Sequence, residues 1–320
     1  MVQIKSVLVA DEIEQQCLDV LKAANIPVVK KTKLPKDELI EELKKHDAVI
    51  VRSATKITAE IIEKSAGNLK LIGRAGTGVD NIDVEAATKH GVLVMNTPSG
   101  NSNSAAELTS TLILALSRHV PQAAGSMKAG KWSRKDYMGS EVSGKTLAII
   151  GLGRIGQIVA KHMQAFGMKT IGYDPLVSAE DAGKLGINWL PLEEIWPKAD
   201  YITVHVPLIP QTTGLIGRET LSKCKPTVRI VNVARGGIVN EKELVDALNE
   251  GKCGGAAIDV FVEEPPTFKP LVDHPKVICT PHLGASTLEA QERVAAEVAE
   301  NIIVLNDRQE MRGVLNAPKK

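Results

Sequence analysis

The sequence has few cysteines and no pattern that would join them. Its four cysteines, Cys17, Cys224, Cys253 and Cys279, are scattered, and none belongs to a C-x-x-C pair. This spacing argues against a disulfide framework and against a structural zinc site. A reducing compartment is therefore expected.

Net charge and long apolar runs are also lacking. Lys and Arg number 39 against 38 for Asp and Glu, which gives a formal charge of +1 and no reason to expect a nucleic acid or a membrane as partner. No run approaches the roughly 18 apolar residues of a membrane span, and residues 4–11 carry no basic leader with an apolar core. We therefore expect a cytoplasmic protein whose partner is a small molecule.

The chain is long and apolar enough for two domains, with 320 residues of which 43% are hydrophobic. Short β-branched runs alternate with amphipathic stretches over residues 7–96, as in βαβ units of a parallel sheet. The pattern restarts at Thr146, with further runs expected near 169–173, 201–206, 229–233, 256–260 and 277–280. There are enough of these runs for a complete Rossmann sheet.

Two helical stretches are expected to join the domains. Residues 102–118 have helical apolar spacing, and a second helix is expected over 286–305, where Ser286 and Glu289 are spaced as in a capping box. The fold expected is α/β with two doubly wound parallel sheets. A Rossmann domain over 99–285 is inserted in a flavodoxin-like, substrate-binding domain over 1–98 and 286–320.

A dinucleotide-binding fingerprint begins the second unit. An apolar run from Thr146 leads into Gly-Leu-Gly-Arg-Ile-Gly at 151–156, and Asp174 ends the next apolar run. Gly151 permits the tight turn, Gly153 lets the backbone approach a pyrophosphate, and Gly156 allows close packing of the next helix, expected over 157–166. Because Asp174 would accept hydrogen bonds from ribose hydroxyls and repel a 2′-phosphate, the cofactor expected is NAD.

An arginine and a histidine follow strands of the second unit. Arg235 comes after the run 229–233 and before two glycines, so its guanidinium could grip a carboxylate at the ligand edge or lie on the surface. His282 sits in Pro-His-Leu-Gly after the run 277–280, and with Glu264 as partner it could act as acid and base or serve the turn alone. His205 is the competing histidine, but its apolar flanks favour a core position.

These motifs resemble those of the D-isomer-specific 2-hydroxyacid dehydrogenases. The resemblance rests on the fingerprint with Asn-Val-Ala-Arg-Gly-Gly (232–237), Asp-Val-Phe-Val-Glu-Glu-Pro-Pro (259–266) and Pro-His-Leu-Gly-Ala (281–285). It implies that Arg235 orients the substrate carboxylate, that His282 is the acid–base group and that Glu264 is its partner. The neighbouring Glu263 is passed over because the family glutamate directly precedes the proline.

Motifs of the first domain narrow the resemblance to the branch of that family that oxidises 3-phosphoglycerate with NAD, the entry step of serine synthesis. They are Val-Arg-Ser (51–53), Leu-Ile-Gly-Arg-Ala-Gly-Thr-Gly (71–78) and Asn-Thr-Pro-Ser-Gly-Asn (96–101). A phosphorylated substrate would also explain two arginines near a cleft. The substrate residues implied are Arg52, Ser53, Arg74, Asn101 and, from a neighbouring subunit, Arg134.

The same resemblance implies the cofactor contacts. Arg154 and Ile155 would contact the pyrophosphate, Asp174 the ribose, and Thr77 and Asp259 the nicotinamide end. Backbone at Ala234 and at residues 282–285, including Gly284 and Ala285, would also face NAD. Val206 departs from the family pattern, because close relatives commonly carry threonine there.

The resemblance further implies a homodimer or homotetramer, with Trp132 and Tyr137 as anchors in the segment 99–140. Long relatives carry a C-terminal regulatory domain, and serine feedback through such a domain is not expected here. Two other functions remain open at this point. One is a sister reductase acting on glyoxylate or hydroxypyruvate, and the other is an NAD(H)-sensing interaction protein of the co-repressor type.

Overall fold

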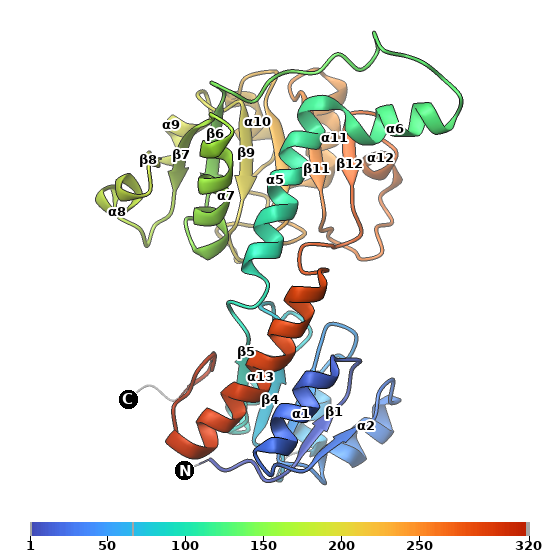
Figure 1. Ribbon diagram of the computed structural model, residues 1–320, viewed down its shortest axis with the longest axis vertical. Coiled ribbons are helices and arrows are strands. Elements are labelled where there is room, and N and C mark those ends of the chain that lie inside the picture. Colours follow the sequence, from blue (N-terminus) through green and yellow to red (C-terminus); the bar gives the residue numbers. More distant parts are fainter. Residues whose placement is uncertain (1, 66, 318–320) are drawn as a thin grey trace. The chain divides into compact units, whose positions relative to one another are not determined.

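The computed structural model describes residues 2–65 and 67–317. The chain folds into two compact units, of which unit 1 lies within Met1–Ser102 and Ala285–Lys320 and unit 2 is Asn103–Gly284 (Figure 1). From the sequence, the boundaries between the two domains were expected between residues 98 and 99 and between residues 285 and 286. Each unit contains one all-parallel sheet flanked by helices, which confirms the expected α/β class.

Unit 1 holds a five-stranded sheet in the order β2-β1-β3-β4-β5, the flavodoxin-like arrangement in which the chain changes direction between β1 and β3. Its elements are β1 (Val7–Val9), α1 (Gln15–Ala23), β2 (Val28–Lys30), α2 (Lys36–Leu43), β3 (Ala48–Val51), α3 (Ala59–Ser65), β4 (Leu71–Arg74), α4 (Val84–Lys89), β5 (Leu93–Asn96) and α13 (Leu288–Arg308).

Helices cover both faces of this sheet, as a parallel sheet requires. Helices α1 and α13 pack side by side on one face, where Leu21 and Val298 are fully buried (Figure 1). Helices α2, α3 and α4 cover the other face through residues such as Leu43 and Ile62. The core of unit 1 is therefore built from two stretches of chain that are far apart in the sequence.

Unit 2 holds a seven-stranded sheet in the order β12-β11-β10-β9-β6-β7-β8, which is the Rossmann order with one further strand. Its elements are α5 (Ser102–Arg118, which starts at the last residue of unit 1), α6 (Val120–Lys128), β6 (Thr146–Ile150), α7 (Arg154–Ala165), β7 (Lys169–Tyr173), α8 (Ala179–Lys184), β8 (Asn188–Trp189), α9 (Leu192–Ile195), β9 (Tyr201–Val204), α10 (Arg218–Lys223), β10 (Arg229–Asn232), α11 (Glu241–Asn249), β11 (Gly255–Ile258), α12 (Lys269–Val272) and β12 (Val277–Cys279).

The strands of unit 2 are in a register that aligns their carboxyl ends. Ile150 pairs with Val204, which also pairs with Asn232; Asn232 pairs with Ile258, and Ile258 with Cys279. Helices α5 and α7 contribute to the core on one face, and α10 and α11 to the core on the other. The segments that follow these five strands therefore emerge in a row along one edge of the sheet.

Two helix starts differ from the sequence expectations. Helix α7 begins at Arg154 rather than at residue 157, because Gly153 is already the N-cap and Gly156 lies in the first turn. Helix α13 begins at Leu288, and its N-cap is Thr287, whose side chain accepts a hydrogen bond from Ala290 N. The expected capping box of Ser286 and Glu289 was wrong. The third helical residue after the N-cap Thr287 is Ala290, which has no side-chain carboxylate to accept a hydrogen bond from the backbone N–H of the N-cap.

Candidate active site

The glycine loop between β6 and α7 has the geometry that a pyrophosphate needs. Gly151 has φ +98°, and a Cβ there would lie 2.5 Å from His205 O. A Cβ on Gly156 would lie 2.1 Å from Gly151 O, so only glycine lets the helix approach the turn this closely. In contrast, a Cβ on Gly153 would meet nothing within 4 Å. The open space is therefore at the helix N-terminus, where a phosphate is favoured.

Asp174 follows β7 and lies beside this loop. Its carboxylate accepts hydrogen bonds from Leu152 N and Leu176 N, both at 2.8 Å. The Trp189 indole donates to Asp174 O at 3.2 Å, and the ring of Trp189 packs on Tyr173 at 5.6 Å between centroids. Each carboxylate oxygen keeps accepting capacity for a ribose hydroxyl.

Arg235 is presented by a loop that a buried asparagine holds. Asn232 is 1% exposed; its amide donates to Arg235 O at 2.8 Å and accepts from Ala234 N at 3.0 Å. The guanidinium donates to Ala234 O at 2.6 Å. A Cβ on Gly236 would lie 1.8 Å from Phe261 O, so only glycine fits at this position, directly after Arg235 and against the loop that follows β11. Asn232, the last residue of β10, was not predicted from the sequence to have a role.

His282 and Glu264 are in direct contact. Nδ1 of His282 lies 2.6 Å from Oε2 of Glu264, and the two side chains keep 50% and 38% of their surface exposed. Glu263 instead accepts a hydrogen bond from the Thr267 hydroxyl. The imidazole is thus held through Nδ1, and Nε2 is left to face a ligand.

A fully buried aspartate shapes the turn that carries His282. Asp259 accepts hydrogen bonds from the Thr280 hydroxyl at 2.6 Å, Leu283 N at 2.7 Å and Gly284 N at 2.9 Å, and its backbone oxygen accepts from His282 N. His282 itself has φ +52°, in the left-handed region. The contact of Asp259 with the nicotinamide stays a prediction. This positioning role of Asp259 and the role of Thr280 were not predicted from the sequence.

The competing histidine, His205, is unsuited to proton transfer near neutral pH. Burial lowers the pKa of its imidazole to about 4, and Nε2 lies 3.0 Å from the Thr203 hydroxyl. Burial likewise raises the pKa of all four thiols, to about 11 or 12. Among the residues that the structure describes, no cluster of histidine, cysteine and carboxylate side chains could hold a metal ion.

The predicted substrate residues of unit 1 lie at the carboxyl ends of β3, β4 and β5. Val51 pairs with Arg74, which in turn pairs with Asn96, so the segments after these strands are neighbours. Asn81, which the sequence reasoning did not single out, donates to Arg52 O at 2.7 Å, and the Thr77 hydroxyl donates to Asn101 Oδ1 at 2.7 Å. Ser53 is exposed on the same segment.

The side chain of Arg52 lies next to the start of α13. Its guanidinium is 3.7 Å from Glu14 Oε1, and both residues line a cavity of about 350 Å³ with Ser286 and Thr287. Unit 1 thus gathers Arg52, Arg74 and Asn101 at one edge, whereas Arg235, Glu264 and His282 belong to unit 2. That the two groups meet on one substrate stays a prediction.

Arg134 lies in the segment between α6 and β6 of unit 2. It is exposed, as are Trp132 (76%) and Met138 (81%), while Tyr137 is partly buried. Ser140, at the end of this segment, accepts a hydrogen bond from Arg229 at 2.9 Å. No helix within residues 2–65 and 67–317 is both long and apolar enough to cross a membrane.

A Rossmann sheet whose carboxyl edge carries a glycine loop, an arginine and a histidine–carboxylate pair has the parts of a dinucleotide-dependent dehydrogenase. Residues 110–284 match the family model described as D-isomer specific 2-hydroxyacid dehydrogenase, NAD binding domain. The chain therefore belongs to the D-isomer specific 2-hydroxyacid dehydrogenase family, and its cofactor is NAD.

Individual relatives agree with this assignment. The chain is 55% identical to the D-3-phosphoglycerate dehydrogenase of Rattus norvegicus over 98% of its own length, and it spans 59% of the length of that relative. The TT0316 protein of Thermus thermophilus superposes with a TM-score of 0.85 at 33% identity, covering 97% of this chain and 99% of that one. The D-lactate dehydrogenase of Aquifex aeolicus, complexed with NAD and lactic acid, gives 0.84 at 29% identity, covering 98% and 100%.

Proposed function

We propose that the chain oxidises 3-phospho-D-glycerate to 3-phosphohydroxypyruvate with NAD, the first step of serine biosynthesis. The observation that carries the chemistry is the 2.6 Å pair of His282 and Glu264 on the sheet edge that also presents Arg235 and the glycine loop. The substrate is proposed from relatives named D-3-phosphoglycerate dehydrogenase that are 48–55% identical over 98% of the chain.

The residues present fit NAD. The exposed backbone at Gly153 and Arg154 would hold the pyrophosphate with Ile155, and Asp174 would accept the ribose hydroxyls. Thr77 and Asp259 are proposed for the nicotinamide end, and the backbone at Ala234, Gly284 and Ala285 is proposed to face NAD as well. When bound, NAD supplies the acceptor for the hydride that leaves C2 of the substrate.

His282 removes the proton of the C2 hydroxyl. Nε2 takes that proton while Glu264 holds Nδ1, so that the positive charge formed on the imidazole lies against a carboxylate. In the reverse direction the same nitrogen returns the proton to the keto oxygen. The exposed position of the pair leaves the proton a path to solvent.

Arg235 binds the substrate carboxylate. A planar guanidinium donates two parallel hydrogen bonds to a carboxylate and also polarises the neighbouring oxygen as it becomes a carbonyl. Asn232 fixes the backbone on both sides of this residue, which keeps the side chain at the ligand edge. Replacement by lysine would supply a point charge without the fork.

We assign the substrate phosphate to unit 1, over residues 1–98 and 286–320. Arg52 and Arg74 supply the positive charge, and Ser53 and Asn101 supply hydrogen bonds from the neighbouring segments. Arg134, from a second subunit, completes the site.

Initial rates of NADH formation test this function. With 3-phosphoglycerate we expect a kcat/KM at least about a hundredfold above that for D-glycerate, because two charge-assisted contacts to the phosphate are lost in glycerate. Arg52→Gln and Arg74→Gln should raise KM for 3-phosphoglycerate and leave D-glycerate turnover unchanged. Equal efficiency with the two acids, or a preference for reducing glyoxylate or hydroxypyruvate, would assign the chain to a sister enzyme. NAD binding without any hydride transfer would favour the interaction-protein alternative.

We further propose a cytoplasmic homodimer or homotetramer. Trp132 and Met138 expose 76% and 81% of their surface within one short segment, which is costly for large apolar side chains unless a partner covers them. A second copy is the partner that the family resemblance implies. Light scattering of wild type against Trp132→Ser measures the oligomeric state, and a wild-type monomer would contradict this proposal.

A further inference from the structure

The segment that follows α13, residues 309–317, runs back along the sheet of unit 1, and we call it the C-terminal tail (Figure 1). Val314 forms an antiparallel bridge with Met95 of β5, and Asn96 N donates a hydrogen bond to Gly313 O at 2.9 Å. Strand β5 is the last strand of the sheet order. The tail therefore covers the backbone groups that this edge strand would otherwise leave open.

Two residues fix the tail on this edge. The side-chain oxygen of Asn316 accepts a hydrogen bond from Val94 N at 2.8 Å, and its amide nitrogen donates to Val92 O at 2.9 Å. Gly313 has φ +66°, and a Cβ there would lie 2.3 Å from Asn96 O. The tail can therefore approach Asn96 this closely only because residue 313 is glycine.

Asn96, at the end of β5, joins the tail to the loop after β4. It is 6% exposed, and its amide nitrogen donates to Thr77 O at 2.7 Å. Its side-chain oxygen is buried and has no hydrogen-bond partner among the residues that the structure describes. Because a buried acceptor without a donor is destabilising, stability alone does not explain an asparagine at this position. The bond to Thr77 points to a role for this asparagine in placing the loop.

Thr77 extends the connection to Asn101, a residue proposed for the substrate. The Thr77 hydroxyl donates to Asn101 Oδ1 at 2.7 Å, so the amide nitrogen of Asn101 is the group that can donate to a substrate oxygen. The fully buried Thr97 joins the same two loops, because its hydroxyl accepts from Gly76 N at 2.7 Å and its own N–H donates to Gly76 O at 3.1 Å. A continuous chain of hydrogen bonds thus connects the tail with Asn101.

Helix α13 holds the other end of the loop that carries Asn101. Arg293 Nε donates to Gly100 O at 2.9 Å, and the Ser99 hydroxyl donates to Glu297 Oε1 at 2.9 Å. The helix and the tail are consecutive in the chain. This loop is therefore held at both ends by the last part of the sequence.

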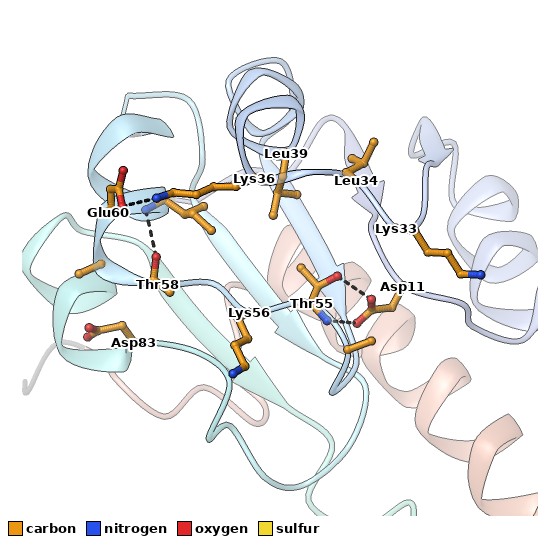
Figure 2. Close-up of a pocket in the computed structure, with 13 residues that line it drawn as sticks. Asp11, Lys33, Leu34, Lys36, Leu39, Thr55, Lys56, Thr58, Glu60 and Asp83 are labelled. Carbon is orange, nitrogen blue, oxygen red and sulfur yellow. Dashed lines mark hydrogen bonds and ion pairs between the residues drawn. The ribbon is translucent and has the colours of Figure 1, made fainter. Parts of the chain in front are cut away.

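The segment that carries Arg52 is held in a different way. Asp11, which follows β1, accepts hydrogen bonds from Arg52 N and from the backbone and hydroxyl of Thr55 (Figure 2). Asn81 donates to the backbone oxygens of the same two residues. All of these groups belong to the first part of the chain. Release of the tail should therefore disturb the segment of Asn101 and leave that of Arg52 in place.

We propose that the C-terminal tail is a tether that positions Asn101 for the substrate, with Asn96 as the positioning residue between them. The substrate role of Asn101 rests on the proposed function. While the tail is bonded to β5, the substrate meets an ordered loop. After the tail is displaced, part of the binding free energy is offset by the ordering of that loop, so KM rises. Substrate affinity is thus controlled by a segment that lies outside the substrate site.

Two glycine variants with the same backbone strain test the tether. Gly313→Ala places a Cβ against Asn96 O and should release the tail, whereas Gly91→Ala is strained at φ +71° but meets nothing within 4 Å. With 3-phosphoglycerate, Gly313→Ala should raise KM about tenfold or more, the loss of one charge-assisted hydrogen bond. Its kcat should stay within about threefold, because His282 and Arg235 belong to unit 2. Gly91→Ala should keep KM within about twofold of the wild type.

A further variant tests the link while the tail stays in place. Asn96→Ala removes the bond to Thr77 O but keeps the backbone bond to Gly313 O, so KM should again rise about tenfold or more. Amide hydrogen exchange at residues 94–96 should become faster only in Gly313→Ala. A KM within about twofold of the wild type in Asn96→Ala, or equal exchange in the two glycine variants, would overturn the proposal.

Failure of the proposed function would give a different result. A wild type that does not oxidise 3-phosphoglycerate but converts D-glycerate, glyoxylate or hydroxypyruvate would contradict that function, and the KM values of the variants are then compared with that acid. A wild type that oxidises 3-phosphoglycerate, together with unchanged KM values in Gly313→Ala and Asn96→Ala, would contradict the tether alone.

Discussion

At the scale of single residues, the histidines of unit 2 differ by what surrounds them. His282 is half exposed and held by Glu264, while His205 is partly buried and bonded to a threonine hydroxyl. The sequence predicted this division from flanking residues. It could not predict Asn232, Asp259 and Thr280 as supports, because their partners become neighbours only when the order of parallel strands is known.

Replacing His282 by alanine tests its role. Loss of a positioned acid–base group should lower kcat by a factor of about 10² to 10⁴. The control His90→Gln changes an exposed histidine of unit 1 and should not alter kcat. Steady-state rates with saturating NAD measure both, and near-normal turnover of His282→Ala would remove the proposed role.

The partly buried imidazole of His205 makes the free energy of unfolding depend on pH. Its folded pKa of about 4 lies below the unfolded value of about 6.5, so the unfolded chain binds more protons between these values and stability falls as pH falls from 6.5 towards 4. At pH 5 this group lowers the free energy of unfolding by about 2 kcal/mol, and above pH 7 it has almost no effect. Urea unfolding of wild type and His205→Gln at pH 5 and 8 measures the difference. Parallel pH profiles would show that the pKa of this imidazole is not lowered by folding.

At the scale of elements, the sequence predicted long, regular segments better than their ends. The run at 169–173 and the helix over 102–118 have the expected bounds as β7 and α5. Strand β8 was missed because its two residues, Asn188 and Trp189, show no alternation. The start of α13 was misplaced because Ser286 and Thr287 are both good N-caps, and only tertiary structure selects between them.

Alanine variants of two glycines where β6 leads into α7 separate the effect on stability from the effect on cofactor binding. Gly156→Ala forces a Cβ to 2.1 Å from Gly151 O and should lower the melting temperature by several degrees. In Gly153→Ala the added Cβ meets nothing within 4 Å, so the melting temperature should not change. The affinity for NADH should nevertheless fall about tenfold or more, because the methyl group occupies the space through which the pyrophosphate approaches the backbone. Thermal unfolding and NADH fluorescence titration measure both. Unchanged NADH affinity in Gly153→Ala would place the pyrophosphate elsewhere.

At the scale of the whole molecule, the two units differ in how their cores are assembled. Unit 2 is one continuous stretch with apolar cores on both faces of its sheet, so residues 103–284 expressed alone should fold and bind NADH. Residues 1–102 alone lack α13, which buries residues such as Val298 and Ile302 on the face shared with α1. Circular dichroism with thermal melts should show cooperative unfolding for the first fragment only. A cooperative transition for residues 1–102 would contradict this expectation.

The split core of unit 1 also has a consequence during synthesis. After the ribosome completes the fifth strand, which ends at Asn96, about 190 further residues must be translated before the missing helix begins at Leu288, a delay of roughly 10–40 s at ordinary elongation rates. Throughout that interval the nascent chain carries a half-covered sheet with exposed aliphatic side chains. Chaperones that shield such surfaces would therefore meet the amino-terminal third of this polypeptide first and release it last.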